Sequence, residues 1–276
     1  MQVNNLNGKV AVVTGASRGL GRRIAARLAQ QGAAVALLAR TKSGLEDTRE
    51  HLAAMNARTL VVPVDLRQPE SVSQVRAIVE RDLGVPSILV NAAGVFGPID
   101  LIKDSDPTAW IDTLLTNTVS SYLTCRTFVD GMIAAGWGRI VNITSAASLH
   151  QPGPLNSAYA TSKVALNQFT RHLASELEGT GVTANVIHPG DVKTDMWADI
   201  KAASERLGSI ADPFLQWAHW VQETGGDDPE KAADLVAGLM SDEAANVNGQ
   251  FLWIKDGLQS PIPSWPEPVD QQPWRK

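Results

Sequence analysis

Residues 9–21, KVAVVTGASRGLG, run from a short apolar segment directly into a glycine-rich turn. The apolar positions at the start of this stretch are consecutive, which predicts a strand buried on both faces, as in a parallel sheet. Gly15, Gly19 and Gly21 permit a tight turn, and a helix is predicted to begin at Gly19 and end at Gln31. Backbone N–H groups in such a turn, with the positive end of the helix dipole, favour binding of a diphosphate. A glycine-rich turn placed between a strand and a helix therefore predicts a nucleotide-binding α/β fold.

The same order of strand, turn and helix recurs along the chain. Further strands are predicted at 34–39, 59–64, 87–90, 139–143, 182–187 and 250–254, and further helices at 43–55, 69–83, 112–135, 157–178 and 229–240. Ser43 is the expected N-cap of the second helix. Alternating strands and helices predict a Rossmann-type, doubly wound parallel sheet of seven strands in three α/β/α layers. We see no linker before residue 257 and expect residues 1–276 to form one domain.

Two segments interrupt this alternation. Residues 195–228 form a long insertion that holds Trp197, Trp217 and Trp220, and a segment of this length predicts a lid over a substrate site. Residues 258–276 contain five prolines and two tryptophans. Proline cannot supply the backbone donors of a regular helix or a central strand, so this tail is expected to be irregular.

Composition excludes several classes of protein. The chain has 276 residues and a net charge of −5, whereas a nucleic-acid protein needs a basic face. The only cysteine, Cys125, is expected in core packing, and we find no convincing spacing of metal ligands and expect no catalytic metal. The first residues do not resemble a signal peptide, and no apolar run approaches the length of a membrane span. These features predict a cytoplasmic protein.

The end of the second predicted strand indicates which nucleotide would bind. An NAD(H) site places an acidic residue there to hold the ribose, but this chain has Arg40 at that position. Arg40 and Arg18 could pair with a 2′-phosphate, so we expect NADP(H) rather than NAD(H). Asp65, after the third strand, could accept a hydrogen bond from the adenine amine or cap a turn.

Tyr159 and Lys163 lie four residues apart on a predicted helix and so share one face. An ammonium group near a phenol favours the phenolate, which predicts a lowered pKa for Tyr159 and a role in proton transfer. Ser145 lies 14 residues before Tyr159, at the carboxyl end of a predicted strand. Ligands bind at these strand ends in open parallel sheets.

With these residues, the chain resembles the short-chain dehydrogenases/reductases of the compact, one-domain branch. The resemblance covers roughly residues 6–257 and follows the order of the family's motifs. The matching pieces are TGASRGLG at 14–21, Asp65, NAAG at 91–94, Asn117, Ser145, YATSK at 159–163, and PG at 189–190 with Val192 and Thr194. Ala92 stands where many relatives have asparagine, and the spacing between Ser145 and Tyr159 is one residue longer than the commonest one.

The resemblance implies a role for each matching residue. Tyr159 would be the acid or base, Ser145 would bind the substrate oxygen, and Lys163 would bind the ribose and lower the Tyr159 pKa. Asn117 would hold a water that connects Lys163 to solvent. The expected cofactor-binding residues are Gly15, Ser17, Arg18, Gly19, Leu20, Gly21, Arg40, Asp65, Leu66, Asn91, Ala92, Ala93, Gly94, Tyr159, Lys163, Pro189, Gly190, Val192 and Thr194. Beside Ser145, the expected substrate contacts are His150, Met196 and Trp197.

The sequence therefore predicts an NADP(H)-dependent oxidoreductase that interconverts a ketone and a secondary alcohol. The apolar residues of the insertion, including Phe214 and Leu215, favour a small or medium, partly apolar substrate. A 3-oxoacyl thioester reductase is the main alternative within the family, and a non-catalytic NADP(H)-binding sensor is a second. The resemblance further implies a homodimer or homotetramer that binds neither nucleic acid nor membrane.

Overall fold

The computed structural model describes residues 5–149, 153–254 and 257–258. Within this part of the chain, one sheet has the strand order β3-β2-β1-β4-β5-β6-β7-β8. All neighbouring strands are parallel except β7 and β8, which are antiparallel. The strands are β1 (Val10–Thr14), β2 (Ala34–Ala39), β3 (Thr59–Pro63), β4 (Ile88–Asn91), β5 (Gly138–Ile143), β6 (Val182–His188), β7 (Phe251–Trp253) and β8 (Gly257–Leu258).

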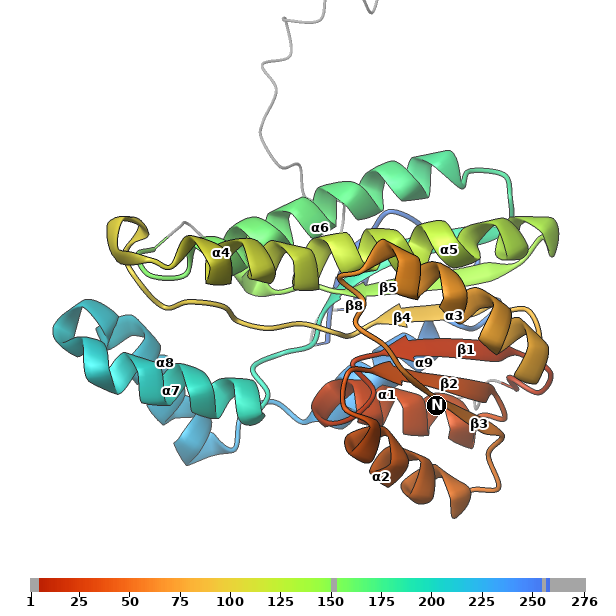
Figure 1. The fold of residues 1–276 in the computed structure, drawn as a ribbon, viewed down its shortest axis with the longest axis horizontal. Coiled ribbons are helices and arrows are strands. Elements are labelled where there is room, and N and C mark those ends of the chain that lie inside the picture. Colours follow the sequence, from red (N-terminus) through yellow and green to blue (C-terminus); the bar gives the residue numbers. More distant parts are fainter. Residues whose placement is uncertain (1–4, 150–152, 255–256, 259–276) are drawn as a thin grey trace, which may run out of the picture.

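Helices cover both faces of the sheet, which confirms the predicted three-layer architecture (Figure 1). One face packs against α1 (Gly19–Gln30), α2 (Lys42–Ala53) and α9 (Pro229–Gly238). The other packs against α3 (Pro69–Asp82), α5 (Ser120–Ala134) and α6 (Ser157–Glu176). The side chains of β1 divide between the two cores: Ala11 and Val13 belong to the first, and Val10 and Val12 to the second. This explains why the strand is apolar at every position rather than at every second one.

The strand order reverses between β1 and β4. The chain proceeds from β1 through β2 to β3 on one side, and from β4 through β5, β6 and β7 on the other. Thr14 and Asn91, the last residues of β1 and β4, are register partners. The loops that follow these two strands therefore separate to opposite sides and leave a crevice at the carboxyl edge of the sheet.

The helix predicted at 112–135 begins earlier and is interrupted. α4 (Pro107–Leu114) starts after Asp106, whose side chain accepts a hydrogen bond from the Thr108 N–H, and proline follows the cap. A π-helical turn at Leu115–Val119 joins α4 to α5. The prediction placed the start of this helix too late, because it did not use the N-cap and the proline as start signals.

The insertion at 195–228 contains two helices. α7 (Asp195–Leu207) and α8 (Asp212–Thr224) form a hairpin that stands to one side of the sheet (Figure 1). Trp197 Nε1 donates a hydrogen bond of 3.1 Å to the Ala218 carbonyl and so ties the two helices together. The long insertion is therefore an ordered unit with its own apolar contacts.

Several predictions about local structure need correction. The sheet has an eighth, antiparallel strand, because β8 pairs with β7 in addition to the seven predicted parallel strands. Ser43 is not the cap of α2: the helix begins at Lys42 after Thr41, and the Thr41 side chain makes no capping bond. The predicted irregular tail lies outside the described residues except for Leu258, and so does His150.

Cys125 is buried in the second core, which confirms the prediction that it serves in packing. Burial raises the pKa of its thiol to about 12. None of the helices in the described ranges combines the length and the apolar character that a membrane span requires.

We expect Phe128→Ala to lower the free energy of unfolding by about 3–5 kcal/mol. Phe128 is among the largest fully enclosed side chains of the core, and its truncation leaves a cavity between α5 and the sheet. Urea denaturation followed by circular dichroism measures the change. Arg126→Ala on the exposed side of the same helix is the control and should change stability by less than about 0.5 kcal/mol.

Candidate active site

A cavity of about 1060 Å³ opens at the carboxyl edge of the sheet, next to the strand reversal. Most of the residues predicted for the cofactor and substrate sites line it. These are Gly15, Ser17, Arg18, Gly19, Leu20, Gly21, Arg40, Asp65, Leu66, Ala92, Ala93, Gly94, Ser145, Tyr159, Lys163, Pro189, Gly190, Val192, Thr194, Met196 and Trp197. Asn91 and Asn117 lie behind its wall, where both are buried.

The glycine-rich turn lies against the loop after β4. Gly15 has a φ of +65°, and a Cβ placed there would lie 2.8 Å from the backbone nitrogen of Ala93. The Ala93 N–H donates to Thr14 Oγ1 over 3.1 Å and joins the ends of β1 and β4. Only glycine satisfies both the left-handed φ and the close approach of the two chains.

The N-terminus of α1 opens into this cavity and suits an anion. Its N-cap, Arg18, makes no side-chain capping bond, and the first turn carries no acidic residue. A Cβ at Gly19 would meet no protein atom within 4 Å, so the absence of a side chain leaves open space there. The first N–H groups of a helix have no partner within the helix and attract phosphate.

The two arginines predicted to bind a 2′-phosphate both line the cavity. Arg40 is exposed at the end of β2. Arg18 Nη1 lies 2.8 Å from the Asp195 carboxylate, in an ion pair that links the glycine-rich turn to the start of α7. Both members of this pair are largely exposed, so it contributes little to stability.

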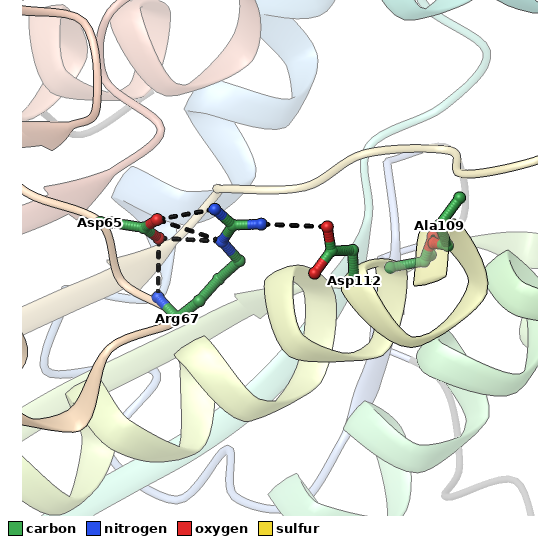
Figure 2. A network of polar contacts seen from close by, with 5 residues as sticks. Asp65, Arg67, Ala109 and Asp112 are labelled. Carbon is green, nitrogen blue, oxygen red and sulfur yellow. Dashed lines mark hydrogen bonds and ion pairs between the residues drawn. The ribbon is translucent and has the colours of Figure 1, made fainter. Parts of the chain in front are cut away.

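Asp65 is held by an arginine that the sequence analysis did not single out (Figure 2). Arg67 donates to both carboxylate oxygens of Asp65 and also lies 3.2 Å from the carboxylate of Asp112 on α4. The hydrogen bond from Arg67 is the main reason that the pKa of Asp65 lies below its ordinary value. A basic residue two positions after the acid was the available signal in the sequence.

Tyr159 and Lys163 both face the cavity from the first part of α6, as their spacing predicted. The Tyr159 ring stacks on Phe96, with 4.5 Å between ring centroids and 26° between the planes. Phe96 in turn makes an edge contact with Phe214 of α8, at 6.1 Å. The sequence analysis missed Phe96, which follows the NAAG motif but does not belong to it.

The predicted lowering of the Tyr159 pKa is wrong for the structure as it stands. Burial raises the pKa of the phenol above 10, a hydrogen bond with Ser145 opposes the rise, and the charge of Asp191 adds to it. Lys163 Nζ lies 5.6 Å from the centre of the Tyr159 ring. Burial also lowers the pKa of Lys163 to about 8, which weakens the ammonium that was expected to stabilise a phenolate.

Lys163 and Asn117 are both held by backbone groups. Lys163 Nζ donates to the Ile143 carbonyl over 2.8 Å. The Asn117 amide exchanges two hydrogen bonds of 2.8 Å with the backbone of Val95. A Cβ at Gly94 would lie 3.4 Å from Asn117 Oδ1 and 3.7 Å from Lys163 Nζ. The π-helical turn in the helix at 107–134 therefore brings Asn117 close to Lys163.

Ser145 follows β5 directly. Its hydroxyl oxygen accepts a hydrogen bond of 3.2 Å from the Ala147 N–H and begins a short 3₁₀ turn. The Ala146 N–H donates to His188 Nδ1, also over 3.2 Å. The backbone around the serine is thus held by the ends of two neighbouring strands, β5 and β6.

The hairpin helices supply an apolar wall to the cavity. Met196 packs with Phe96, Phe214 and Trp217 around Ile200, in a cluster separate from the two main cores. Trp197 also lines the cavity, but its indole nitrogen is used in the bond between α7 and α8. Within the described residues, no group of three or more histidine, cysteine or acidic side chains is arranged to hold a metal ion.

Comparisons with known proteins agree on one family. A family model described as short chain dehydrogenase matches residues 9–205. The 3-oxoacyl-(acyl-carrier-protein) reductase FabG of Pseudomonas aeruginosa is 36% identical over 92% of this chain and 98% of its own length. A short-chain type dehydrogenase/reductase of Picea abies is 33% identical over 91% and 93%.

Solved structures show the same fold. An NAD⁺-bound xylitol dehydrogenase matches with a TM-score of 0.84 and 27% identity, over 91% of this chain and 99% of the other. Actinorhodin polyketide ketoreductase with NADPH matches with a TM-score of 0.81 and 30% identity, over 89% and 95%. These two relatives carry different nicotinamide cofactors, so the similarity itself does not choose between them.

The raised pKa of Tyr159 can be measured directly, because the chain has only two tyrosines. In a Tyr122→Phe variant, Tyr159 is the only phenol, and its titration by phenolate absorbance should have a midpoint above 10. Adding Phe96→Ala should lower the midpoint, since water then reaches the ring. A midpoint that does not respond to Phe96→Ala would show that this ring does not shield the phenol.

The buried ammonium makes stability depend on pH. Burial lowers the Lys163 pKa from 10.5 to about 8, so the unfolded state binds more protons between these values and stability rises with pH. The free energy of unfolding of the wild type relative to Lys163→Met should therefore increase between pH 8 and pH 10. Urea denaturation measures it, and exposed Lys231→Met is the control. A difference independent of pH would contradict the shift.

Proposed function

This chain belongs to the short-chain dehydrogenase/reductase family of oxidoreductases, which act on CH–OH and C=O groups, and from that premise we propose that it reduces a ketone with NADPH, or runs the reverse reaction. The observation that carries the proposal is the convergence of Ser145, Tyr159 and Lys163 on one cavity with the α1 N-terminus. The residues present fit a nicotinamide dinucleotide. The uncapped α1 N-terminus and the open space at Gly19 would receive the diphosphate.

NADP(H) is the cofactor that the charges favour. Arg40 lies at the end of β2, where an NAD(H) site would have an acidic residue to bind the ribose. Arg18 faces the same cavity from the glycine-rich turn. Guanidinium groups bind phosphate through charged hydrogen bonds, so both side chains support a 2′-phosphate site. Asp65 would meet the adenine, and the segment after Pro189 would meet the nicotinamide.

The bound cofactor would supply the hydride, and the protein supplies the proton and the placement. Tyr159 would donate its phenolic proton to the ketone oxygen, which becomes the hydroxyl of the product. The high pKa that burial gives this phenol keeps it protonated, as the donor must be, until the reaction begins. The Ser145 hydroxyl would donate to the same oxygen and stabilise its developing negative charge.

Lys163 and Asn117 would return the proton. Lys163 holds a proton at neutral pH even with its pKa lowered to about 8, and a value this close to neutrality makes the group easy to deprotonate and reprotonate. Asn117 lies beside it with its amide fixed to the Val95 backbone. The pair therefore supports a proton path from solvent to Tyr159 along α6.

The apolar wall favours a free ketone as substrate. Phe96, Phe214 and Trp217 face the cavity, and stacking of Phe96 on Tyr159 places an aromatic surface beside the reacting oxygen. The basic residues of this region are Lys193, just before α7, and Lys201 and Arg206 on α7. The two lysines lie against the Trp197 ring at 5.1 and 5.9 Å, whereas Arg206 is exposed. Lys201 also pairs with Glu205. These contacts make the two lysines less available for ion pairs with an acidic carrier protein.

A 3-oxoacyl thioester reductase is the second candidate, and the identity with FabG of P. aeruginosa over almost the whole chain favours it. Both candidate functions reduce a ketone to an alcohol. They differ in the substrate, which is a free ketone in the first and a 3-oxoacyl thioester in the second. We also propose a homodimer or homotetramer built on the helices at 112–135 and 157–178. Exposed apolar side chains on α4, α5 and α6 support this assembly, namely Ile111, Tyr122 and Val164.

We expect the purified protein to oxidise NADPH in the presence of a ketone, and Tyr159→Phe to reduce kcat by about 10²–10⁴-fold because the proton donor is lost. Cofactor absorbance measures turnover with NADPH and with NADH. NADPH binding by Tyr159→Phe, followed by quenching of tryptophan fluorescence, is the control for folding. Faster turnover with NADH would overturn the assignment of Arg18 and Arg40.

The same assay separates the two candidates when one 3-oxo chain is offered as a methyl ketone and as an acyl-carrier thioester. A higher kcat/KM for the ketone supports the first candidate, and the opposite order supports the second. NADPH binding without turnover of either compound would favour the sensor.

A further inference from the structure

Arg67 lines the cavity and makes several polar contacts there, but the proposed function gives it no role. Its backbone N–H donates to Asp65 Oδ1 over 3.0 Å. Its side-chain Nε donates to both oxygens, over 3.0 and 3.2 Å, and Nη2 donates to Oδ2 over 2.8 Å. Both side chains are partly buried and line the cavity. The guanidinium and the backbone N–H of Arg67 therefore both orient the Asp65 carboxylate.

These bonds limit what Asp65 can still bind. A carboxylate has about four acceptor positions, and Oδ1 already receives a backbone and a guanidinium donor. Oδ2 accepts a hydrogen bond from Nη2 and a longer one from Nε, which also donates to Oδ1. The carboxylate therefore has room for about one further donor. Asp65 is thus held as an ionised acceptor. A group that donates a hydrogen bond can join it, whereas one that offers another oxygen is repelled.

A second carboxylate holds the arginine from the other side. Arg67 Nη1 lies 3.2 Å from the carboxylate of Asp112, which belongs to α4 (Figure 2). The guanidinium therefore connects the loop after β3 with a helix on the far side of the strand reversal. With one anion at each end, the planar fork can neither rotate nor leave Asp65 without breaking an ion pair.

The position of Asp65 relative to the sheet indicates which part of a bound dinucleotide it would contact. Asp65 follows β3, the edge strand, while Ser145 follows β5, and three strands lie between β3 and β5. At about 4.8 Å per strand, the two residues lie about 19 Å apart across the sheet. A dinucleotide whose nicotinamide lies at Ser145 would bring its adenine to Asp65, with the α1 N-terminus between them.

We propose that Arg67 is a positioning residue that holds Asp65 as a reader of the adenine 6-amine, and that Asp112 anchors Arg67 in this orientation. The inference rests on the proposed function, because it needs a nicotinamide dinucleotide in the cavity. It predicts selection for the base itself. Adenine presents an amine at C6, which donates to Asp65, whereas hypoxanthine presents a carbonyl oxygen, which the fixed carboxylate repels.

The experiment compares the binding of NADPH and its hypoxanthine analogue, deamino-NADPH, by isothermal titration calorimetry, which needs no substrate. The wild type should bind NADPH at least about tenfold more tightly, as expected for a hydrogen bond to a charged group. In Arg67→Gln the carboxylate can turn, so the ratio should fall to about twofold. Arg67→Lys should behave like Arg67→Gln, since lysine keeps the charge but loses the planar fork.

Two further variants separate positioning from folding. Arg76→Gln on α3 removes a guanidinium of comparable exposure that pairs with Glu80 outside the cavity, and should leave the ratio unchanged. Asp112→Asn loosens only the outer end of the network and should lower the ratio about two- to threefold at an unchanged Tm. A purely structural role for Arg67 would lower Tm and weaken both ligands equally.

The outcomes distinguish this inference from the proposed function. If the wild type binds NADPH and the tenfold preference persists in Arg67→Gln and Arg67→Lys, the inference is wrong and the function stands. If the wild type binds NADPH and deamino-NADPH equally tightly, the inference is also wrong and the proposed function stands. If the wild type binds neither dinucleotide, the proposed function fails and the inference fails with it.

Discussion

The structure depends on the close approach of two backbones at the strand reversal. Thr14, at the end of β1, is buried, and its hydroxyl accepts the Ala93 N–H from the loop after β4. Gly15 allows the next residues to turn away without a side chain between the two chains. Because this contact fixes where the two loops separate, it places the glycine-rich turn and the part of the cavity lined by Tyr159 and Lys163 relative to each other.

A buried polar chain carries this constraint across the sheet. Asn91, expected from the resemblance to line the cofactor site, donates to Asn142 Oδ1 over 2.8 Å and accepts from the Thr124 hydroxyl. Asn142 donates in turn to Thr170 on α6. Unpaired amides at this depth would cost about 1–3 kcal/mol each, so the register of β4, β5 and the two helices is strongly specified. Asn91 thus helps to fix the position of α6, the helix that carries Tyr159 and Lys163.

The sequence predicted those parts of the molecule that rest on local patterns. Consecutive apolar residues identified the parallel strands, and the spacing of Tyr159 and Lys163 placed both on one face of α6. Contacts made between distant segments left no such pattern. Phe96 meets Tyr159 and Phe214 only after three separate parts of the chain have folded, and α4 begins outside the apolar period. The sign of the Tyr159 pKa shift was misjudged because burial, to which the stacked Phe96 ring contributes, outweighs the opposing hydrogen bond with Ser145.

The same burial shifts the pKa values of both Tyr159 and Lys163. Desolvation disfavours the charged form of each group, so it raises the pKa of the phenol and lowers that of the ammonium. Both shifts disfavour the phenolate–ammonium pair, and at neutral pH the site holds the phenol beside an ammonium whose pKa is about 8. A polar group placed in the cavity would reverse part of both shifts, since it restores some of the solvation that burial removed. The stacking of Phe96 on the ring therefore contributes to the burial that keeps the Tyr159 phenol protonated.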